Sequence, residues 1–514
     1  MLVKTFCAAV NGLDATVVTV EVHKSRGVMC HLTGLPDNAV RESLDRIKAA
    51  LENNGFRFPV ADITINMAPA DLRKEGSGYD LPIAIGILAC DEKLNADRLS
   101  DYMLIGELGL DGRLQPVRGA LPISIRARAE KFKGLIVPKA NVREAAVVNN
   151  LDVYGMENIA EVIDFLRGGE AQPELIDTRK IFYEQQSHFE FDFADVKGQQ
   201  TVKRAMEVAA AGGHNIIMIG PPGSGKSMMA KRLPSILPPL SLAESLETTQ
   251  VHSIAGALSR DTSLISQRPF RSPHHTISQV ALVGGGINPQ PGEISLAHNG
   301  VLFCDELPEF NRSVLEVLRQ PLEDRKITIS RSKYTIEYPC SFMFVASMNP
   351  CPCGYYGDAT HTCVCTANQI QRYMNKISGP LLDRIDIQVE VSPVDFDDLQ
   401  KRSSTGESSA TIRARVNEAR RFARERYAQN GAGIRCNADL TARETERYCV
   451  LSDGARTLLK TAFDALGMSA RGYDRILRLG RTIADLDRAE VITETHISEA
   501  IMLRSLDKKY FGEA

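Results

Sequence analysis

The chain has 514 residues, of which 61 are Lys or Arg and 64 are Asp or Glu, so its formal net charge is −3. Its length corresponds to roughly three or four domains, and a composition of 43% hydrophobic and 24% charged residues is typical of globular proteins rather than disordered or fibrous ones. The balanced charge excludes a molecule that coats nucleic acid through general basicity, so contacts with DNA or RNA would come from local patches.

Residues 1–168 are predicted to form an α+β domain. Strand character is clearest in Thr16–Val22 and Ile63–Met67, and Leu135–Val137 is a third, shorter strand. Between the first two strands, apolar residues recur at helical spacing, and Asn38 is the expected N-cap of that helix. The recurring residues are Val40, Leu44, Ile47 and Leu51.

The apolar stretches of this domain are too short to cross a membrane. The longest, such as Leu81–Cys90, fall well short of the ~18 residues that a spanning helix needs. The first residues, MLVKTFCAAVNGLDA, lack the long apolar region of a signal peptide. We therefore expect a cytoplasmic protein that has no membrane partner.

The rest of the chain is predicted to contain a linker, a parallel-sheet domain and a helical domain. Residues 169–187 are polar and lack clear periodicity, which indicates a linker. Residues 188–395 alternate apolar strands with loops and helices, as parallel α/β sheets do. Residues 396–514 have a charged, helical pattern. The expected buried strands of the sheet are Ile216–Ile219, Val301–Phe303 and Phe342–Ala346.

The most specific motif is GPPGSGKS at 220–227, which matches the phosphate-binding pattern G-x-x-x-x-G-K-[ST] in full. It follows an apolar strand and precedes a helical pattern, as this motif requires. Its glycines let backbone N–H groups curl around a phosphate, while Lys226 suits the β- and γ-phosphates and Ser227 suits Mg²⁺. The expected nucleotide-contacting residues are Gly220, Pro221, Pro222, Gly223, Ser224, Gly225, Lys226, Ser227 and Met228.

Polar residues end the next two strands. Asp305 and Glu306 follow the apolar run VLFC, and Asn349 follows FMFVASM. Asp305 is the expected Mg²⁺ ligand beside Ser227, because ligands bind at the carboxyl ends of strands in open α/β sheets. Glu306 fits a base that polarises the attacking water. Asn349 would orient that water or sense the γ-phosphate.

The order of these motifs resembles that of the AAA+ ATPases, specifically their magnesium-chelatase-like branch. Longer segments narrow the resemblance to the YifB/ComM family: RPFRSPHHTIS at 268–278, the segment 284–310 that ends in FCDELPEF, and SGPLLDRID at 378–386. The resemblance implies an α/β fold in which an AAA+ P-loop domain is followed by a helical lid, with ATP and Mg²⁺ as cofactors.

The resemblance also assigns roles to two arginines. Arg384 would be the arginine finger, whose guanidinium neutralises charge on the phosphoryl group transferred in a neighbouring subunit. Arg471, in SARGYDRILRLG, would be the sensor-2 arginine. The residues alone leave a second interpretation open, because Arg384 could pair with Asp383 or Asp386 at the surface, and Arg471 could be an ordinary exposed helix residue.

The function implied by the resemblance is that of a ring motor. A finger acting on a neighbour implies a homo-oligomer, usually a hexamer, that hydrolyses ATP and acts on single-stranded or branched DNA. Such a motor would resemble the branch-migration helicases and translocases of recombination, transformation and competence. The alternative is an ATPase that remodels a partner protein, as the magnesium-chelatase motor subunit does.

Four cysteines crowd into the segment CPCGYYGDATHTCVC. Thiolates carried on two short turns can surround a tetrahedral Zn²⁺, although the one-residue spacing within each pair is tighter than usual. Structural Zn²⁺ and reduced thiols both remain open, with His361 as a substitute ligand. The cysteines are Cys351, Cys353, Cys363 and Cys365.

Two insertions carry basic residues that suit a DNA backbone. The segment RSPHHTIS at 271–278 is expected to be an exposed loop, which by the resemblance would face a central pore. The segment 326–338 alternates like a hairpin with a basic tip. The alternatives are a loop that packs on a neighbour and a solvated tip. The candidate DNA contacts are Arg268, Arg271, His274, His275, Arg331 and Lys333.

Residues 1–168 resemble the Lon protease domain, through 72–88 and 105–122. That resemblance implies a catalytic Ser–Lys dyad, but the serine position falls at Gly78 and the lysine position at Pro122. Ser77 and Lys74 are nearby, yet a loop shift would be needed to recruit them. We therefore expect a scaffold or a binding domain, not a protease.

Overall fold

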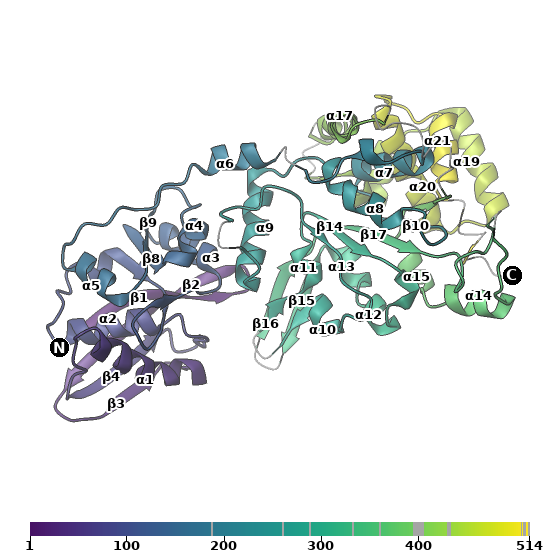
Figure 1. Cartoon of the computed structure of the whole chain (residues 1–514). Helices are drawn as coiled ribbons and strands as arrows, with labels where there is room; N and C mark the ends of the chain where they lie inside the picture. The colour runs from purple at the N-terminus through teal and green to yellow at the C-terminus, as the bar shows by residue number, and fades with distance from the viewer. Residues whose placement is uncertain are drawn as a thin grey trace. The chain divides into compact units, whose positions relative to one another are not determined.

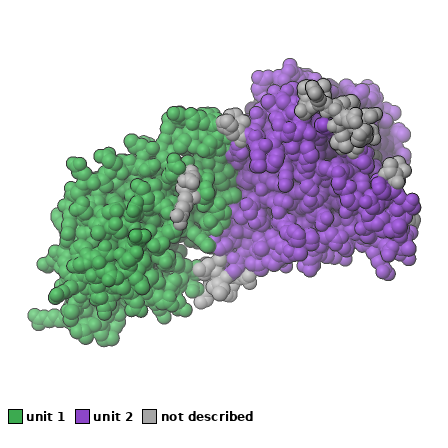
Figure 2. Space-filling model, in the orientation of Figure 1, with its two compact units in different colours: residues 1–185, 242–266, 330–338 green, residues 186–241, 267–329, 339–514 purple. Residues whose placement is uncertain are grey.

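The computed structural model describes residues 1–186, 189–259, 262–286, 289–331, 334–358, 361–393, 406–428, 433–504, 506, 510 and 511, the side chains of residues 331 and 334 excepted. These residues form two compact units, shown as a cartoon in Figure 1 and in two colours in Figure 2. Unit 1 comprises residues 1–185, 242–266 and 330–338; unit 2 comprises 186–241, 267–329 and 339–514. Among the described helices, none combines the length and apolarity of a membrane span.

Unit 1 is built on a seven-stranded mixed sheet with the order β3-β4-β2-β1-β5-β8-β9. Its strands are β1 (Leu2–Asn11), β2 (Asp14–Ser25), β3 (Cys30–Thr33), β4 (Asp62–Ala68), β5 (Tyr102–Leu104), β8 (Gly134–Pro138) and β9 (Asp152–Met156), beside a separate pair, β6 (Glu107–Leu108) and β7 (Leu114–Gln115). Its helices are α1 (Asn38–Asn53), α2 (Asp80–Cys90), α3 (Ala120–Ala129), α4 (Val142–Ala145), α5 (Ile159–Leu166), α6 (Thr178–Gln185) and α9 (Leu242–Ala255).

The strands expected in this part of the chain lie within β2, β4 and β8, and the expected helix is α1. Its N-cap is Asp37, so the prediction of Asn38 was wrong by one residue. The Asp37 carboxylate accepts a hydrogen bond from Val40 N–H at 2.8 Å and another from Gly76 N–H at 3.1 Å. Asp37 therefore caps α1 and fixes a distant loop at once, which the local sequence could not show.

Unit 1 also contains α9, which comes from within the range expected to form the ATPase domain. Gly119 N–H, at the start of α3, donates to the Ser253 carbonyl of α9 at 3.2 Å. The Ser253 hydroxyl donates to the buried Glu144 carboxylate, which also accepts from Leu121 N–H at 3.0 Å. These contacts make α9 part of the first unit. The segment 169–187, interpreted as a linker, contains α6 with Phe182 buried.

Unit 2 contains a five-stranded sheet whose neighbouring strands are all parallel, in the order β11-β14-β17-β10-β18. The strands are β10 (Ile216–Ile219), β11 (Phe270–Arg271), β14 (Val301–Cys304), β17 (Met343–Met348) and β18 (Ile387–Glu390). The predicted strand 216–219 agrees residue for residue; β14 is one residue longer than predicted, and β17 begins one residue later and ends two residues later.

Helices flank this sheet, and a helical group follows it in the chain (Figure 1). The helices of the sheet region are α7 (Gln200–Gly212), α8 (Lys226–Arg232), α10 (Gln279–Val283), α11 (Glu293–Leu296), α12 (Arg312–Glu316), α13 (Arg319–Asp324), α14 (Ala367–Met374) and α15 (Gly379–Leu382). The helical group contains α17 (Ser409–Ala428), α18 (Ala442–Tyr448), α19 (Asp453–Leu466), α20 (Ala470–Leu486) and α21 (Glu494–Met502). Two small pairs complete the fold: β12 (Gly284–Gly285) with β13 (Gln290–Pro291), and the predicted hairpin, β15 (Lys326–Arg331) with β16 (Tyr334–Pro339).

Candidate nucleotide-binding site

The ends of three neighbouring strands bring the predicted ATP-site residues together. β14, β17 and β10 are adjacent and parallel, so they end at the same edge of the sheet. The phosphate loop 220–227 follows β10, Asp305 and Glu306 follow β14, and Asn349 follows β17. Ligands of open parallel sheets bind at this carboxyl edge.

The phosphate loop has the backbone conformation that its glycines allow. Gly223 and Gly225 have φ angles of +76° and +90°, which side-chain-bearing residues rarely adopt. A β-carbon at either position would meet nothing within 4 Å, so there is open space beside both glycines. Open space beside a loop rich in backbone N–H groups fits a phosphate group.

Lys226 opens α8, and its ammonium group points back into the loop. Nζ donates to the carbonyls of Gly220 and Pro221 at 2.7 and 2.8 Å, and to Asn349 Oδ1 at 3.3 Å. Burial lowers the pKa of Lys226 to about 8, although the nearby charges of Asp305 and Glu306 oppose that shift. Lys226 and Asn349 are therefore brought together as predicted, beside the open loop.

Ser227 and Asp305 are also in contact. The Ser227 hydroxyl donates to Asp305 Oδ2 at 2.6 Å, and the Ser347 hydroxyl of β17 donates to the other carboxylate oxygen. A hydroxyl and a carboxylate at adjacent positions are the hard oxygen donors that Mg²⁺ prefers. The sequence interpretation missed Ser347, because a serine inside an otherwise apolar strand carries no motif.

Glu306 has a strained backbone and an exposed carboxylate. Its φ is +52°, in the left-handed region that non-glycine residues avoid. Its N–H donates to Asp305 Oδ1 at 3.1 Å, and its side chain is 56% exposed. His275 Nδ1 lies 3.8 Å from the carboxylate. The sequence predicted both residues, but for unrelated roles.

Arg384 lies at the opposite edge of the sheet from the phosphate loop. It precedes β18, which runs parallel to β10, whereas the loop follows β10. The four residues of each strand separate the two edges by about 13 Å. Arg384 Nε donates to the Arg319 carbonyl at 3.0 Å, and the guanidinium pairs with Glu323. Its side chain is therefore not directed at the phosphate loop of its own chain.

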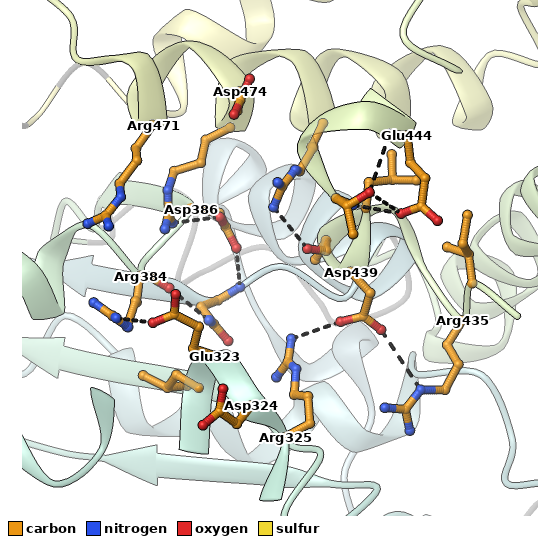
Figure 3. A pocket seen from close by; sticks show the side chains of 18 of the residues that line it. Glu323, Asp324, Arg325, Arg384, Asp386, Arg435, Asp439, Glu444, Arg471 and Asp474 are labelled. Atoms are coloured by element: carbon orange, nitrogen blue, oxygen red, sulfur yellow. Dashed lines mark hydrogen bonds and ion pairs between the residues drawn. The ribbon is translucent and has the colours of Figure 1, made fainter. Parts of the chain in front are cut away.

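Arg384 and Arg471 line one cavity of about 840 Å³ (Figure 3). Figure 3 shows both side chains along the same side of it, Arg471 from α20 and Arg384 from the turn before β18. Arg471 is 67% exposed and lies 3.8 Å from Asp383. The sequence thus placed both arginines far apart in the chain, and the structure brings them to one surface.

A buried network that the sequence did not reveal anchors the Arg384 segment. Asp386 accepts from Asn215 N–H at 3.0 Å and from Arg475 of α20 at 2.8 Å. Asn215 Nδ2 donates to the Arg384 carbonyl at 2.8 Å. Burial alone would raise the pKa of Asp386, but Arg475, His214 and the Asn215 hydrogen bond hold that pKa well below its usual range. The network ties the arginine segment to the start of β10.

The four predicted cysteines converge on one point. Their sulfur atoms all lie within 4.8 Å of one another, and three pairs are 3.3, 3.7 and 3.6 Å apart. Tetrahedral Zn²⁺ with Zn–S bonds of about 2.3 Å would separate its sulfurs by about 3.8 Å. The donor set therefore fits a structural Zn²⁺. His361 lies outside the cluster and 3.5 Å from Asp358, so it is not a substitute ligand here.

The cysteine segment also contacts the phosphate loop. It begins two residues after Asn349, and Gly354 packs so closely on Pro222 that a β-carbon on Gly354 would lie 2.6 Å from Pro222 Cδ. The cysteine segment and the nucleotide site are therefore connected at two points, the chain after Asn349 and the Gly354–Pro222 contact.

The predicted DNA contacts divide into two groups. Arg268 donates to the carbonyls of Pro238 and Asn299 at 2.6 and 2.7 Å, and Arg271 pairs with Glu293 through Nε and one terminal nitrogen. The guanidinium groups of these two arginines are therefore engaged by groups of the protein itself. The other group comprises His274 and His275, whose rings pack 4.1 Å apart in the loop after β11, and the hairpin tip, where Lys333 and the side chain of Arg331 lie outside the described residues.

The protease-like region shows no assembled dyad among its described residues. Gly78 precedes α2, and Pro122 is buried within α3. The Ser77 hydroxyl donates to Glu107, while the buried Lys74 amine donates to the Pro69 carbonyl. Ser77 and Lys74 therefore have separate partners.

Three family models together match most of the chain. The model described as "Magnesium chelatase, subunit ChlI" matches residues 192–399, which contain the nucleotide site. The model "Subunit ChlI of Mg-chelatase" matches residues 20–141, and "Magnesium chelatase, subunit ChlI C-terminal" matches residues 406–504.

Whole proteins resemble the chain over nearly its full length. Competence protein ComM of Haemophilus influenzae is 43% identical over 501 residues, which is 96% of each chain. YifB of Escherichia coli, an uncharacterized protein, is 43% identical over 498 residues, 97% of this chain and 96% of its own. Lon protease 2 of Bacillus subtilis is 30% identical over 159 residues, 28% of this chain and 27% of its own. The chain therefore belongs to the YifB/ComM family of magnesium-chelatase-like AAA+ ATPases.

Proposed function

We propose that the chain is an ATP-hydrolysing ring motor that moves along DNA. The observation that carries the motor is the meeting of the phosphate loop, Ser227 with Asp305, and Lys226 with Asn349 at one sheet edge. Bound Mg²⁺ supplies charge neutralisation for the triphosphate. Lys226 would bind the phosphates, while Ser227 and Asp305 would hold the metal ion.

The remaining residues of this edge handle the attacking water. Glu306 has an exposed carboxylate on the residue after Asp305, where it accepts a proton from water. The Asn349 amide lies next to Lys226 and can donate or accept hydrogen bonds. Through these hydrogen bonds Asn349 orients the water towards the γ-phosphate. Both groups act only when nucleotide fills the open loop.

The position of the arginines supports assembly into a ring. Arg384 and Arg471 face a cavity at the edge of the sheet that the chain's own phosphate loop does not occupy. A guanidinium there completes a nucleotide site on a second copy, as an arginine finger does in trans. Repetition of this head-to-tail contact generates a closed ring, which we propose to be a hexamer.

The DNA track is supported by the loop after β11 and by the relatives. The imidazoles of His274 and His275 can form hydrogen bonds, and they lie at the end of the sheet where the nucleotide is proposed to bind. In the sequence, two basic residues, Arg331 and Lys333, lie where β15 is followed by β16. A relative over the full length is named a competence protein. We place this activity in the cytoplasm, on single-stranded or branched DNA.

We further propose that Cys351, Cys353, Cys363 and Cys365 hold a structural Zn²⁺. Four thiolates leave no open coordination position, so the ion would stabilise the loop and take no part in catalysis.

An ATPase assay across single-stranded, duplex and four-way-junction DNA tests the function. We expect stimulation by single-stranded or branched DNA, and binding that weakens steeply as salt rises. Glu306→Gln should retain ATP without turnover, so it serves as the control for contaminating ATPases.

A different outcome would favour the alternative function, an ATPase that remodels a partner protein. Stimulation by a partner protein with no response to any DNA would replace the DNA motor by a protein remodeller, in keeping with the chelatase-subunit models that match the chain. Loss of ATP binding in Glu306→Gln would contradict the assigned base.

A further inference from the structure

We propose that Zn²⁺ binding at the cysteine cluster and ATP binding at the phosphate loop are coupled, so that each ligand raises the affinity of the protein for the other. The inference rests on the proposed function, because it joins the two sites proposed there. It assigns Gly354 and Tyr373 as positioning residues, which act through Pro222 and Asn349. The cysteine cluster consists of Cys351, Cys353, Cys363 and Cys365.

The segment that leads into the cluster also borders the phosphate loop. The Met348 carbonyl, at the end of β17, accepts a hydrogen bond from the N–H of Gly220 at 3.2 Å. Asn349 follows, and its Oδ1 accepts from Lys226 Nζ at 3.3 Å. Cys351 comes two residues later and is fully buried. The first cysteine is therefore fixed to a short segment that contacts both ends of the phosphate loop.

The turn that follows Cys353 packs directly on the phosphate loop. Gly354 has a φ of +88°, and its N–H donates to the Cys351 carbonyl at 3.0 Å. A β-carbon on Gly354 would lie 2.6 Å from Cδ and 2.8 Å from Cγ of Pro222. The ring of Pro222 is part of its backbone, so a displacement of the ring displaces the loop. The position of the cysteine turn therefore bears on the shape of the phosphate site.

The far end of the cysteine segment returns to Asn349. Helix α14 begins at Ala367, two residues after Cys365. Tyr373 of this helix is buried, which raises the pKa of its hydroxyl, and a hydrogen bond with the Asn349 backbone opposes that rise. Both ends of the segment thus meet at Asn349, one through the chain and the other through Tyr373.

The coupling follows from what each ligand fixes. The four sulfur atoms lie within 4.8 Å of one another, so one Zn²⁺ would join the two ends of the segment with little movement. ATP would fix the phosphate loop from its other side. Whichever ligand binds first holds Pro222 and Asn349 in the place that the second ligand needs, which lowers the conformational entropy lost in the second step. Such a coupling is reciprocal by thermodynamic necessity.

The test measures both affinities on the full chain. Zn²⁺ affinity is measured by competition with a chromophoric chelator, with and without a non-hydrolysable ATP analogue, at constant free Mg²⁺. The affinity for the analogue is measured with and without Zn²⁺. We expect each ligand to tighten the other by about tenfold and by the same factor in both directions, within the range of about 5–150-fold that coupled sites show. A factor of one would overturn the inference.

Gly354→Ala tests the contact without removing a cysteine. The added β-carbon would press on Pro222, so the Kd for the analogue should rise about tenfold while the zinc content stays unchanged. Gly357→Ala is the matched control, because Gly357 has a similar φ of +78° but its β-carbon would meet nothing within 4 Å among the described residues. It should bind the analogue like the parent chain. Equal affinities of the two variants would overturn the inference.

Tyr373→Phe removes the hydroxyl at the Asn349 backbone and keeps the buried ring. Because Asn349 is proposed to orient the attacking water, kcat should fall by about fivefold, the effect of one ordinary hydrogen bond, while the KM for ATP changes little. A purely structural role would instead lower the melting temperature and the zinc content. A kcat equal to that of the parent chain would overturn the assignment of Tyr373.

Two outcomes separate this inference from the function beneath it. If the parent chain binds the ATP analogue but no Zn²⁺, the zinc proposal and the coupling both fall, and the ATP motor stands. If it binds both ligands but neither changes the affinity for the other, the coupling alone falls.

Discussion

Lys226 is buried, and burial disfavours the charged form of its amine. The residue is 9% exposed, and its hydrogen bonds go to two carbonyl oxygens, one hydroxyl and one amide oxygen, not to carboxylates. Burial lowers the pKa of this amine to about 8, so a large fraction of it is neutral in mildly alkaline solution. A bound triphosphate brings several negative charges and favours the protonated amine.

The expected consequence is that ATP binding takes up a proton at alkaline pH. Below pH 8, Lys226 is already charged and affinity should be flat. Above pH 8, the apparent Kd should rise by up to about tenfold per pH unit, because the neutral amine must first be protonated. Titration with fluorescent ATP at pH 7, 8 and 9 measures this, and calorimetry in two buffers of different ionisation enthalpy counts the protons.

Lys226→Arg is the matched control, since a guanidinium remains charged throughout this range. Its affinity is expected to be lower but independent of pH. A parent chain whose Kd stays constant from pH 7 to pH 9 would contradict the lowered pKa.

At the scale of secondary-structure elements, the sequence predicts those features whose determining residues are close together in the chain. Strand 216–219 and the phosphate loop were predicted because apolar run, glycines and lysine are contiguous. The approach of His275 to Glu306 and of Asp386 to Arg475 was not, because each depends on the register of elements far apart in the chain. The residue types of a contiguous motif can be identified from the sequence alone. The side-chain partners of those residues cannot, because they come from distant parts of the chain.

The cysteine turns give an element-scale prediction. The purified protein should contain about one zinc per chain, and Cys351→Ser should lose it, because three thiolates and one hydroxyl hold Zn²⁺ poorly. The melting temperature should fall by several degrees, since the ion binds only the folded loop. Elemental analysis and thermal melting give the two readouts.

Cys30→Ser is the control for this experiment, because Cys30 is a free cysteine of β3 outside the cluster. It should keep both the metal and the melting temperature. Iron in place of zinc, or full zinc content in Cys351→Ser, would contradict the assignment.

At the scale of the whole molecule, the phosphate loop and Arg384 lie at opposite ends of the parallel strands of one sheet. The loop follows β10, and Arg384 precedes β18. Arg384→Ala should therefore bind ATP normally yet lose at least about 10³-fold in kcat, the usual contribution of an arginine finger. Lys226→Ala should fail to bind ATP and still present its arginine. Mixing equal amounts should restore up to about a quarter of the parent rate, because one interface in four then pairs an intact loop with an intact arginine.

Each variant alone provides the baseline for that mixture. No recovery after mixing would contradict action between copies, and so would full turnover by Arg384→Ala in a monomeric state. Loss of ATP binding by Arg384→Ala would sink the finger assignment.

Because the phosphate loop and the Arg384 guanidinium lie at opposite ends of the strands, every copy has one end that supplies an arginine and one end that needs one. In a linear string of n copies, one catalytic centre always lacks its complement, so n − 1 are competent, whereas closure makes all n competent. Specific activity per chain should thus climb with protein concentration and then plateau once the string has closed on itself.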